Sequence, residues 1–274
     1  MKIHFSVLLA STLFITSGLV CAAEKGLVFG SVAMDIPAEM HKRLKPLTEY
    51  LSREIGVPVT LRLSSNMKGA INMVAKGEAD VAYLTPVAYL NSHTKGNTRL
   101  VAKTVTKGKD SFQLMVVAKA DSTINSIDDL KGKAFAFGDK KALLQRAVVV
   151  GGGIKLEELG EYAFIGHYDN IARGVSVGDF DAGILKDTKA FAWEKKGLKI
   201  VYSSDPLPPY NIAVRDGLSD DIYQKLKRAF LKLDINMPAD KAVIKALNKN
   251  YDGFANTSDT EYDVVRKLIA PFQK

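Results

Sequence analysis

The sequence has little cysteine, tryptophan and histidine, and no stretch in which one sign of charge dominates. Its 274 residues include one cysteine, one tryptophan and four histidines. A single cysteine cannot form an internal disulfide, so the fold must depend on a packed core. The 38 basic and 30 acidic residues are interleaved, and aromatic residues are not grouped with the basic ones. This distribution argues against a nucleic-acid-binding surface.

Recognisable catalytic motifs are also missing. The chain has no serine elbow, no His-Glu-x-x-His pair and no pair of carboxylates at strand ends. The histidines are far apart in sequence, so neither a metal site nor a cofactor is expected. Composition is that of a globular protein, with 47% hydrophobic and 25% charged residues, which excludes a disordered chain. An enzyme is the least favoured of three functional hypotheses.

The only long apolar stretch lies at the N-terminus. Lys2 precedes an almost wholly apolar run over residues 4–20, and small residues 21–23 come before Glu24 and Lys25. A basic start, an apolar run of about 15 residues and a small-residue end are typical of a secretory signal peptide. A membrane-spanning helix would need about 20 apolar residues. We predict that residues 1–23 form a cleaved signal peptide, cut before Ala23 or Glu24, and that the mature chain is periplasmic.

Cys21 raises the alternative of a lipid-anchored protein, in which a cysteine becomes the first residue. The residues before it, Gly18, Leu19 and Val20, fit the usual lipoprotein pattern poorly. A soluble periplasmic product is therefore favoured, and cleavage would remove the only cysteine.

Strands and helices alternate in the first third of the mature chain. The predicted strands are 27–33, 57–63 and 80–84, and the predicted helices are 37–55, 66–76 and 86–92. Two strands, 99–105 and 112–118, then follow with a polar turn between them. Alternation of this kind indicates a mostly parallel sheet with helices on its faces.

A second α/β unit begins after residue 120. Its predicted strands are 133–137, 162–165, 180–185 and 198–202, and its predicted helices are 127–130, 140–150 and 169–177. The C-terminal tail is predicted to be helical over 219–233, 238–248 and 258–269. Two such units suggest two lobes with a ligand cleft at their strand ends. We assign residues 24–104 plus 205–274 to lobe 1 and residues 105–204 to lobe 2, with crossings at 103–113 and 204–212 as the hinge.

Several phrases in this order resemble a known family. They are GEADVAYLTPVAYL, SIDDLKGKAFAFGD, GHYDN and GDFDAG, and together they resemble the phosphate, phosphite and phosphonate-binding proteins of bacterial ABC transporters over essentially the whole mature chain. The resemblance implies a type II periplasmic-binding-protein fold, α/β in class, that closes on a small-molecule ligand. It also implies a monomer that delivers this ligand to an inner-membrane permease.

One motif of that family is missing. The resemblance implies a Ser-Thr-Ser-Gly-type anion loop after the Phe-Gly-Asp strand end, but residues 137–146 contain no serine or threonine and the segment is about six residues short. Lys140, Lys141 and Arg146 lie there instead, either to attract an anion or as the solvated face of a helix. We expect a cleft suited to a larger or less charged ligand than a small dianion.

The candidate ligand contacts are residues at predicted strand ends and helix starts that match the family's cleft positions. They are Met34, Met67, Tyr83, Thr85, Lys140, His167, Asp169, Asn170 and Asn211. A second functional hypothesis keeps the fold, with the closed receptor acting on a membrane sensor kinase or chemoreceptor instead of a permease.

Overall fold

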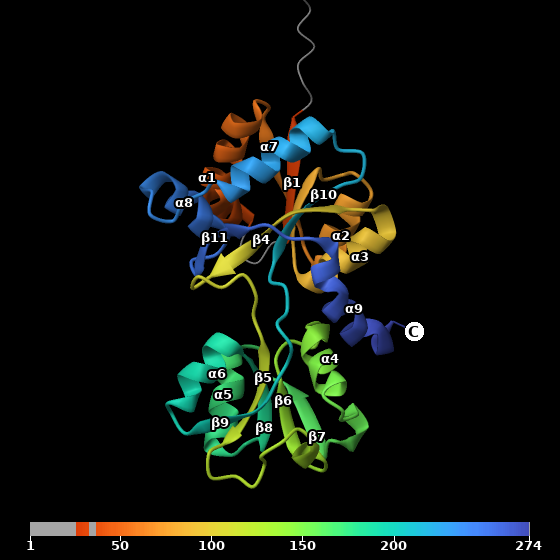
Figure 1. The fold of residues 1–274 in the computed structure, drawn as a ribbon, viewed down its shortest axis with the longest axis vertical. Coiled ribbons are helices and arrows are strands. Elements are labelled where there is room, and N and C mark those ends of the chain that lie inside the picture. The colour runs from red at the N-terminus through yellow and green to blue at the C-terminus, as the bar shows by residue number, and fades with distance from the viewer. Residues whose placement is uncertain (1–25, 33–36, 274) are drawn as a thin grey trace, which may run out of the picture.

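The chain forms two lobes, each built on one β-sheet (Figure 1). The computed structural model describes residues 26–32 and 37–273. The strand order is β11-β4-β10-β3-β1-β2 in lobe 1 and β7-β6-β8-β5-β9 in lobe 2. The predicted signal peptide, Cys21 and the candidate residue Met34 lie outside the described residues.

Lobe 1 combines the N-terminal third of the chain with the C-terminal quarter. Its strands are β1 (Leu27–Val32), β2 (Val59–Ser64), β3 (Val81–Leu84), β4 (Arg99–Thr106), β10 (Asn211–Val214) and β11 (Tyr251–Ala255). Its helices are α1 (Pro37–Ile55), α2 (Met67–Ala75), α3 (Pro86–Gly96), α7 (Asp220–Leu231), α8 (Pro238–Leu247) and α9 (Asp263–Ile269). The buried positions of α1, including Met40, Leu44, Leu47 and Leu51, follow the helical spacing of the sequence and face the sheet.

Lobe 2 is formed by the middle of the chain. Its strands are β5 (Leu114–Lys119), β6 (Ala134–Phe137), β7 (Glu161–Phe164), β8 (Ala182–Lys186) and β9 (Leu198–Ser203). Its helices are α4 (Leu143–Gly151), α5 (Tyr168–Val177) and α6 (Asp187–Glu194). Strands β6, β7 and β8 are parallel, as the alternation of elements predicts.

Both sheets are mixed, but most strands of each run in one direction, as the sequence predicts. In lobe 1, β10 is antiparallel to both β3 and β4. In lobe 2, β5 is antiparallel to both β8 and β9. The cause is that the chain passes from one lobe to the other and back. Strand β10 enters lobe 1 from the side facing lobe 2, so it runs opposite to β3 and β4, which end on that side.

Three elements are absent from the sequence prediction. Strand β10 follows a proline-rich stretch, α6 follows β8 without a break, and β11 lies in a tail predicted to be helical. Strand β11 has the sequence YDGFA, whose Asp and Gly disfavour strands, but pairing with β4 and packing of Phe254 on Phe230 hold it in place. The predicted helix 258–269 divides into a 3-10 turn, Asp259–Tyr262, and α9.

Two crossing segments join the lobes and are bonded to each other. They run between β4 and β5 and between β9 and β10 (Figure 1). Phe112 and Leu207 exchange two backbone hydrogen bonds, of 3.0 and 2.8 Å. Pro208 and Pro209 follow Leu207 and restrict the second crossing further.

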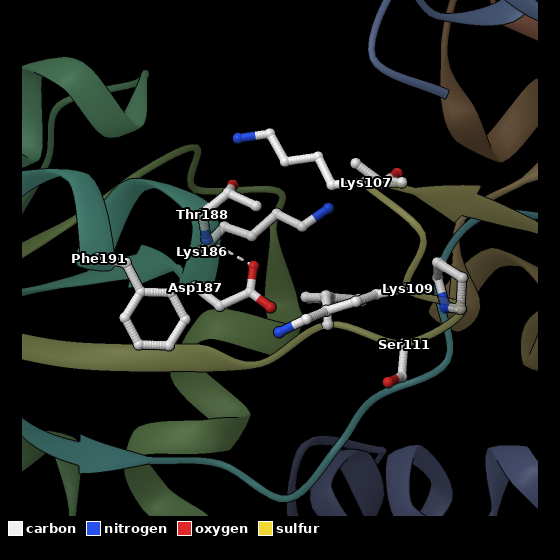
Figure 2. A pocket seen from close by; sticks show the side chains of 10 residues that line it. Lys107, Lys109, Ser111, Lys186, Asp187, Thr188 and Phe191 are labelled. Carbon is white, nitrogen blue, oxygen red and sulfur yellow. Dashed lines mark hydrogen bonds between the residues drawn. The ribbon is translucent and has the colours of Figure 1, made fainter. Parts of the chain in front are cut away.

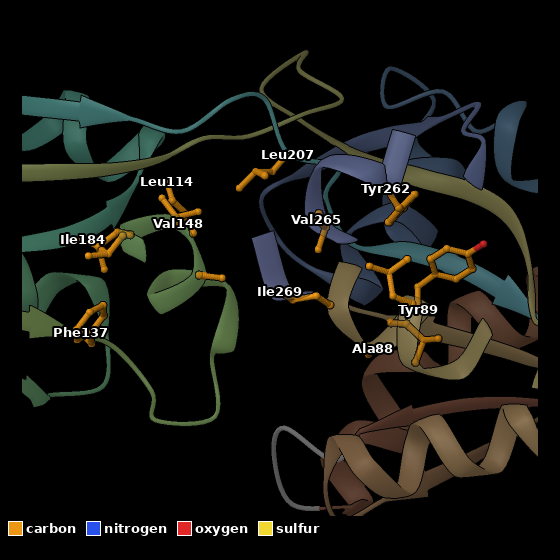
Figure 3. Packing of buried hydrophobic residues seen from close by; sticks show 14 of the residues in the cluster. Ala88, Tyr89, Leu114, Phe137, Val148, Ile184, Leu207, Tyr262, Val265 and Ile269 are labelled. Atoms are coloured by element: carbon orange, nitrogen blue, oxygen red, sulfur yellow. The ribbon is translucent and has the colours of Figure 1, made fainter. Parts of the chain in front are cut away.

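The C-terminal segment makes a third connection between the lobes. Buried residues of lobe 2 form one apolar cluster with Leu207 and with the α9 residues Val265 and Ile269 (Figure 3). Helix α9 packs on α4 so closely that a Cβ atom on Gly151 would lie 2.5 Å from Cδ2 of Leu268. A side chain at position 151 would therefore force the end of the Leu268 side chain to move.

Lys103 ties the C-terminal segment to the first crossing. Its ammonium group lies 2.9 Å from Asp110 and 2.6 Å from Glu261, and its side chain is 9% exposed. Burial alone would lower the pKa of Lys103, but the hydrogen bonds to Glu261 and Asp110 outweigh burial and raise it. The same hydrogen bond lowers the pKa of Asp110.

Shortening Leu268 to alanine should weaken the contact between α9 and α4. Because Leu268 is only half-buried, we expect Leu268→Ala to lower the free energy of unfolding by about 1–2 kcal/mol, less than the 2–5 of a fully buried leucine. Urea denaturation of the mature protein measures this loss. Val177→Ala, at a position 66% exposed on lobe 2, is the control and should change stability by less than about 0.5 kcal/mol. Equal effects of the two substitutions would contradict the role assigned to this contact.

Removal of the Lys103 charge should destabilise the protein in a pH-dependent way. Both carboxylates remain partly hydrated, so we expect Lys103→Met to cost about 1–3 kcal/mol near pH 7, below the value for a fully buried pair. The folded-state pKa of Asp110 is lowered, so its contribution is present above the unfolded pKa and is lost as pH falls through the folded pKa. The stability difference between wild type and variant, measured by denaturant unfolding, should therefore shrink in acid. A difference that stays constant down to pH 3 would contradict the ion pair.

Candidate functional site

The strand ends of both lobes face the crossings. Lys186, the last residue of β8, pairs with Leu114, the first residue of β5 after the first crossing. Leu84, the last residue of β3, likewise pairs with Asn211, the first residue of β10 after the second crossing. The loops that follow these strands therefore lie between the lobes, where open α/β sheets bind ligands.

Tyrosines line the lobe 1 side of this region. The rings of Tyr83 and Tyr210 stack with centroids 5.0 Å apart, and Tyr251 meets Tyr83 edge-on at 6.4 Å. The hydroxyl groups of Tyr83 and Tyr251 are hydrogen-bonded to each other. Burial raises the pKa of all three, that of Tyr251 to about 12, so each stays neutral at physiological pH.

Tyr168 extends this group of tyrosines toward lobe 2. It is the first residue of α5, and burial raises its pKa. A side-chain hydrogen bond with Gln145 opposes this shift, while the neighbouring Tyr210 and Asp187 raise the pKa further. Tyr168, Tyr210, Asp187 and Gln145 therefore lie near one another between the lobes.

The Gln145 side chain hydrogen-bonds to the backbone at the end of β6. Gln145, only 6% exposed, accepts a hydrogen bond of 2.7 Å from the backbone N–H of Gly138 through Oε1. Asp139 then accepts the N–H of Lys141, and α4 begins at Leu143 with no side-chain cap. This strand end is where the family resemblance implies a hydroxyl-rich anion loop. In this chain the backbone N–H of Gly138 donates to Gln145 instead and is not free to bind an anion.

A pocket lies on the other side of Asp187, between the first crossing and lobe 2 (Figure 2). Its volume is about 180 Å³, and its lining includes Lys107, Lys109, Phe112, Lys186, Asp187 and Phe191. We call it the lysine pocket. The Asp187 carboxylate accepts hydrogen bonds from the backbone N–H groups of Gln113 and Thr188, so it is held in place by the chain itself.

The candidates of lobe 1 are mostly engaged within the protein. Tyr83 is buried in the tyrosine stack, and Thr85 caps α3 by accepting the N–H of Ala88 at 3.1 Å. Met67 begins α2 and packs against the apolar cluster. Asn211 is fully buried, and neither polar atom of its amide has a hydrogen-bond partner among the described residues.

The candidates of lobe 2 lie at the helix starts. His167, Asp169 and Asn170 are exposed at the N-terminus of α5. Asp169 pairs with Lys189 at 2.7 Å, and Asn170 donates to the carbonyl oxygen of Ile165. Lys140 is exposed, and its backbone carbonyl accepts a hydrogen bond from Arg146, whose guanidinium covers the Phe164 ring. The eight candidates among the described residues therefore do not converge as a single group.

Sequence reasoning missed four residues that the structure places between the lobes. Lys186 ends β8, one residue past the predicted strand end, so the strand-end rule applied one residue later would have found it. Gln145 is a polar residue on the buried side of α4, three and four residues before Val148 and Val149, which was a visible signal. No sequence pattern marks Lys107 and Lys109 as site residues, because the turn that carries them is brought beside α6 by the tertiary structure.

Two further observations concern metal ligands and membrane-spanning helices. Within residues 26–32 and 37–273, no three His, Cys, Asp or Glu side chains come together in a way that would hold a metal ion. No helix in the same ranges is long and apolar enough to span a membrane.

The two-sheet architecture defines the class as a type II two-lobed binding protein. A family model described as "ABC transporter, phosphonate, periplasmic substrate-binding protein" matches residues 29–262. The chain belongs to this family. It is therefore a periplasmic substrate-binding protein of an ABC transporter, as the resemblance implied.

Individual relatives agree with this assignment. The chain is 27% identical over 266 residues to the phosphate-import protein PhnD of Mycolicibacterium smegmatis, covering 85% of this chain and 83% of that protein. Among solved structures it is similar to XAC2383 of Xanthomonas citri bound to ATP, with a TM-score of 0.72, 21% identity and coverage of 90% and 96%. It is also similar to PhnD1 of Prochlorococcus marinus in complex with methylphosphonate, with a TM-score of 0.68, 18% identity and coverage of 91% and 99%. Both structures confirm the two-lobed fold.

Replacing Gln145 by leucine should destabilise the protein, because it removes the acceptor of the Gly138 N–H. Gln145→Leu leaves the buried N–H of Gly138 without an acceptor, so we expect a loss of about 1–3 kcal/mol in the free energy of unfolding. The Gly138 amide should also exchange its hydrogen faster, which NMR measures directly. The control is Gln224→Leu on the exposed face of α7, with a change below about 0.5 kcal/mol. An unchanged Gly138 exchange rate would contradict the cap.

Proposed function

We propose that this protein captures a small oxyanion of the phosphate or phosphonate class between its lobes and delivers it to the permease. The observation that carries the proposal is the positive pocket between the first crossing and lobe 2, with three lysines against one carboxylate. The names of two relatives, a phosphate-import protein and a methylphosphonate complex, support the same ligand class. The family and its curated relative are transport proteins, which favours this role over the sensory alternative.

The sequence-based expectation of a larger or less charged ligand is revised in this proposal. That expectation rested on the missing hydroxyl loop after β6, and Gln145 does occupy the backbone donor there. It did not take account of Lys107, Lys109 and Lys186, whose charges favour an anion.

Binding is proposed to act through lobe closure about the two crossings. Lobe 1 would comprise residues 24–104 and 205–274, and lobe 2 residues 105–204, an assignment supported by the membership of the two sheets. None of the eight described candidates lines the lysine pocket. We retain His167, which is exposed at the start of α5 and caps no helix with its side chain, as a contact for any part of the ligand that extends beyond this pocket. Met34, Met67, Tyr83, Thr85, Lys140, Asp169, Asn170 and Asn211 would shape the cleft or hold its loops.

We further propose that the mature protein acts as a monomer and without catalytic turnover. Export would use the apolar N-terminal segment as a cleaved signal peptide, with lipid attachment at Cys21 the less favoured outcome. N-terminal sequencing of the secreted protein distinguishes these two forms.

A thermal-shift series tests the ligand class. The mature protein is heated with phosphate, phosphite, methylphosphonate or ATP, the last because a structural neighbour binds it. A ligand at 100 times its dissociation constant stabilises the folded state by about 2.7 kcal/mol, which corresponds to about 5–10 °C for a chain of this size. We expect such a shift with a small oxyanion and a smaller one with ATP.

Isothermal titration of the responding ligand gives its stoichiometry, expected to be one per chain. Failure of all three small oxyanions to shift the melting temperature would contradict the proposed function. A response to ATP alone would restore the expectation of a larger ligand.

A further inference from the structure

The lysine pocket concentrates positive charge from two parts of the fold. Lys107 and Lys109 extend from the first crossing toward lobe 2, and Lys186 extends from the end of β8 toward the crossing (Figure 2). Among the described residues, none of these three ammonium groups lies within 4.0 Å of a carboxylate. The single carboxylate of the lining, Asp187, already accepts two backbone hydrogen bonds. The lining therefore carries two more positive than negative charges.

The two lysines of the crossing are held by a tight turn. Thr106 and Lys109 exchange two backbone hydrogen bonds, and Lys107 and Gly108 between them have φ angles of 52° and 72°. The Gly108 N–H also donates to the Asp252 carboxylate at 3.0 Å, which fixes the turn to lobe 1. A lysine at positive φ is uncommon and costs conformational energy, so the turn places Lys107 at the expense of local stability.

Lys186 is the most enclosed of the three. Its side chain is half-buried and its ammonium lies 4.9 Å from the centroid of the Phe112 ring. Burial lowers the pKa of Lys186, and the neighbouring charge of Asp187 only partly opposes this shift. Lys109 similarly lies 6.0 Å from the Phe191 ring. Lys109 remains exposed, whereas partial burial beside the Phe112 ring strengthens the attraction of Lys186 to an anion.

We propose that the lysine pocket, and not the end of β6, receives the negatively charged group of the ligand, and that this group is a dianionic oxyanion. This inference rests on the proposed function, the capture of an oxyanion. It adds the place where the oxyanion binds and the charge that the oxyanion carries. Two excess positive charges are matched by a phosphonate or phosphate dianion better than by a sulfonate monoanion. At the end of β6, by contrast, the Gly138 N–H is already engaged, since Gln145 accepts it.

The size of the pocket limits the rest of the ligand. Its volume of about 180 Å³ equals roughly six water molecules at about 30 Å³ each. This space accommodates methylphosphonate or phosphate, whereas most of a nucleotide would have to lie outside it. A dianion there would contact the crossing and lobe 2 together, which links binding to the hinge.

Titration calorimetry with methylphosphonate on the mature protein tests the inference. Lys186→Met removes the charge with little change in length, and we expect affinity to fall about 10- to 100-fold, the loss of one charged hydrogen bond. Lys186→Arg keeps the charge and should recover most of the affinity. Lys195→Met, at the other end of α6 and outside the pocket, is the matched control and should bind as wild type does. Methanesulfonate, which has the same shape with one charge fewer, should bind wild type at least 10-fold more weakly than methylphosphonate.

The exposed turn lysines supply a second, independent variant. If Lys186→Met fails to fold by circular dichroism, the double variant Lys107→Met/Lys109→Met replaces it and should lower affinity and flatten its salt dependence. Wild-type affinity in Lys186→Met, or in the double variant where that replaces it, would overturn the inference and leave the proposed function standing. An equal loss in Lys195→Met would also overturn it, because the effect would then be one of net charge. Absence of binding of phosphate, phosphite and methylphosphonate to wild type would overturn both proposals.

Discussion

Leu268 of α9 rests on Gly151 of α4, where any larger residue would meet its side chain. Through this contact a helix of the C-terminal segment, anchored in lobe 1, becomes part of the apolar cluster of lobe 2. The lobes therefore share buried surface away from the crossings, and their relative orientation is limited by what this packing tolerates. Interiors of this density respond to rotation by switching between packed arrangements more readily than by gradual deformation. When the lobes close on a ligand, the contact between α9 and α4 must either be kept or be replaced by another packed arrangement.

Charged contacts hold the C-terminal segment in register with the rest of lobe 1. Lys103 connects it to the first crossing through Asp110 and Glu261. Tyr89 of α3 donates to Asp259 at 2.6 Å, and Arg266 pairs with the same carboxylate. The segment thus connects three parts of the protein: the crossing, a helix beside the strand ends, and α4 of lobe 2. A structural change at the first crossing can therefore reach α4 of lobe 2 through the C-terminal segment. Such coupling requires that the contact between α9 and α4 have two discrete arrangements.

Much of the fold could be predicted from the sequence because local patterns and the family resemblance agree. The alternation over residues 27–96 gives β1, α1, β2, α2, β3 and α3 nearly as the structure has them. The missed strand β11 depends on pairing with β4, which no local pattern encodes. The site was predicted less well for the same reason. Strand-end residues were found, but the meeting of Lys107 and Lys109 with Lys186 is set by tertiary structure, and the role of Gln145 depends on the bend after Gly138.

The paired crossings have a consequence for how tightly a ligand is held. Because Phe112 and Leu207 are hydrogen-bonded to each other and prolines follow Leu207, the two connections form one short ribbon whose strands are restrained together. An open receptor on such a ribbon explores few lobe orientations. Little conformational entropy is then lost when the lobes close, so more of the interaction free energy appears as affinity.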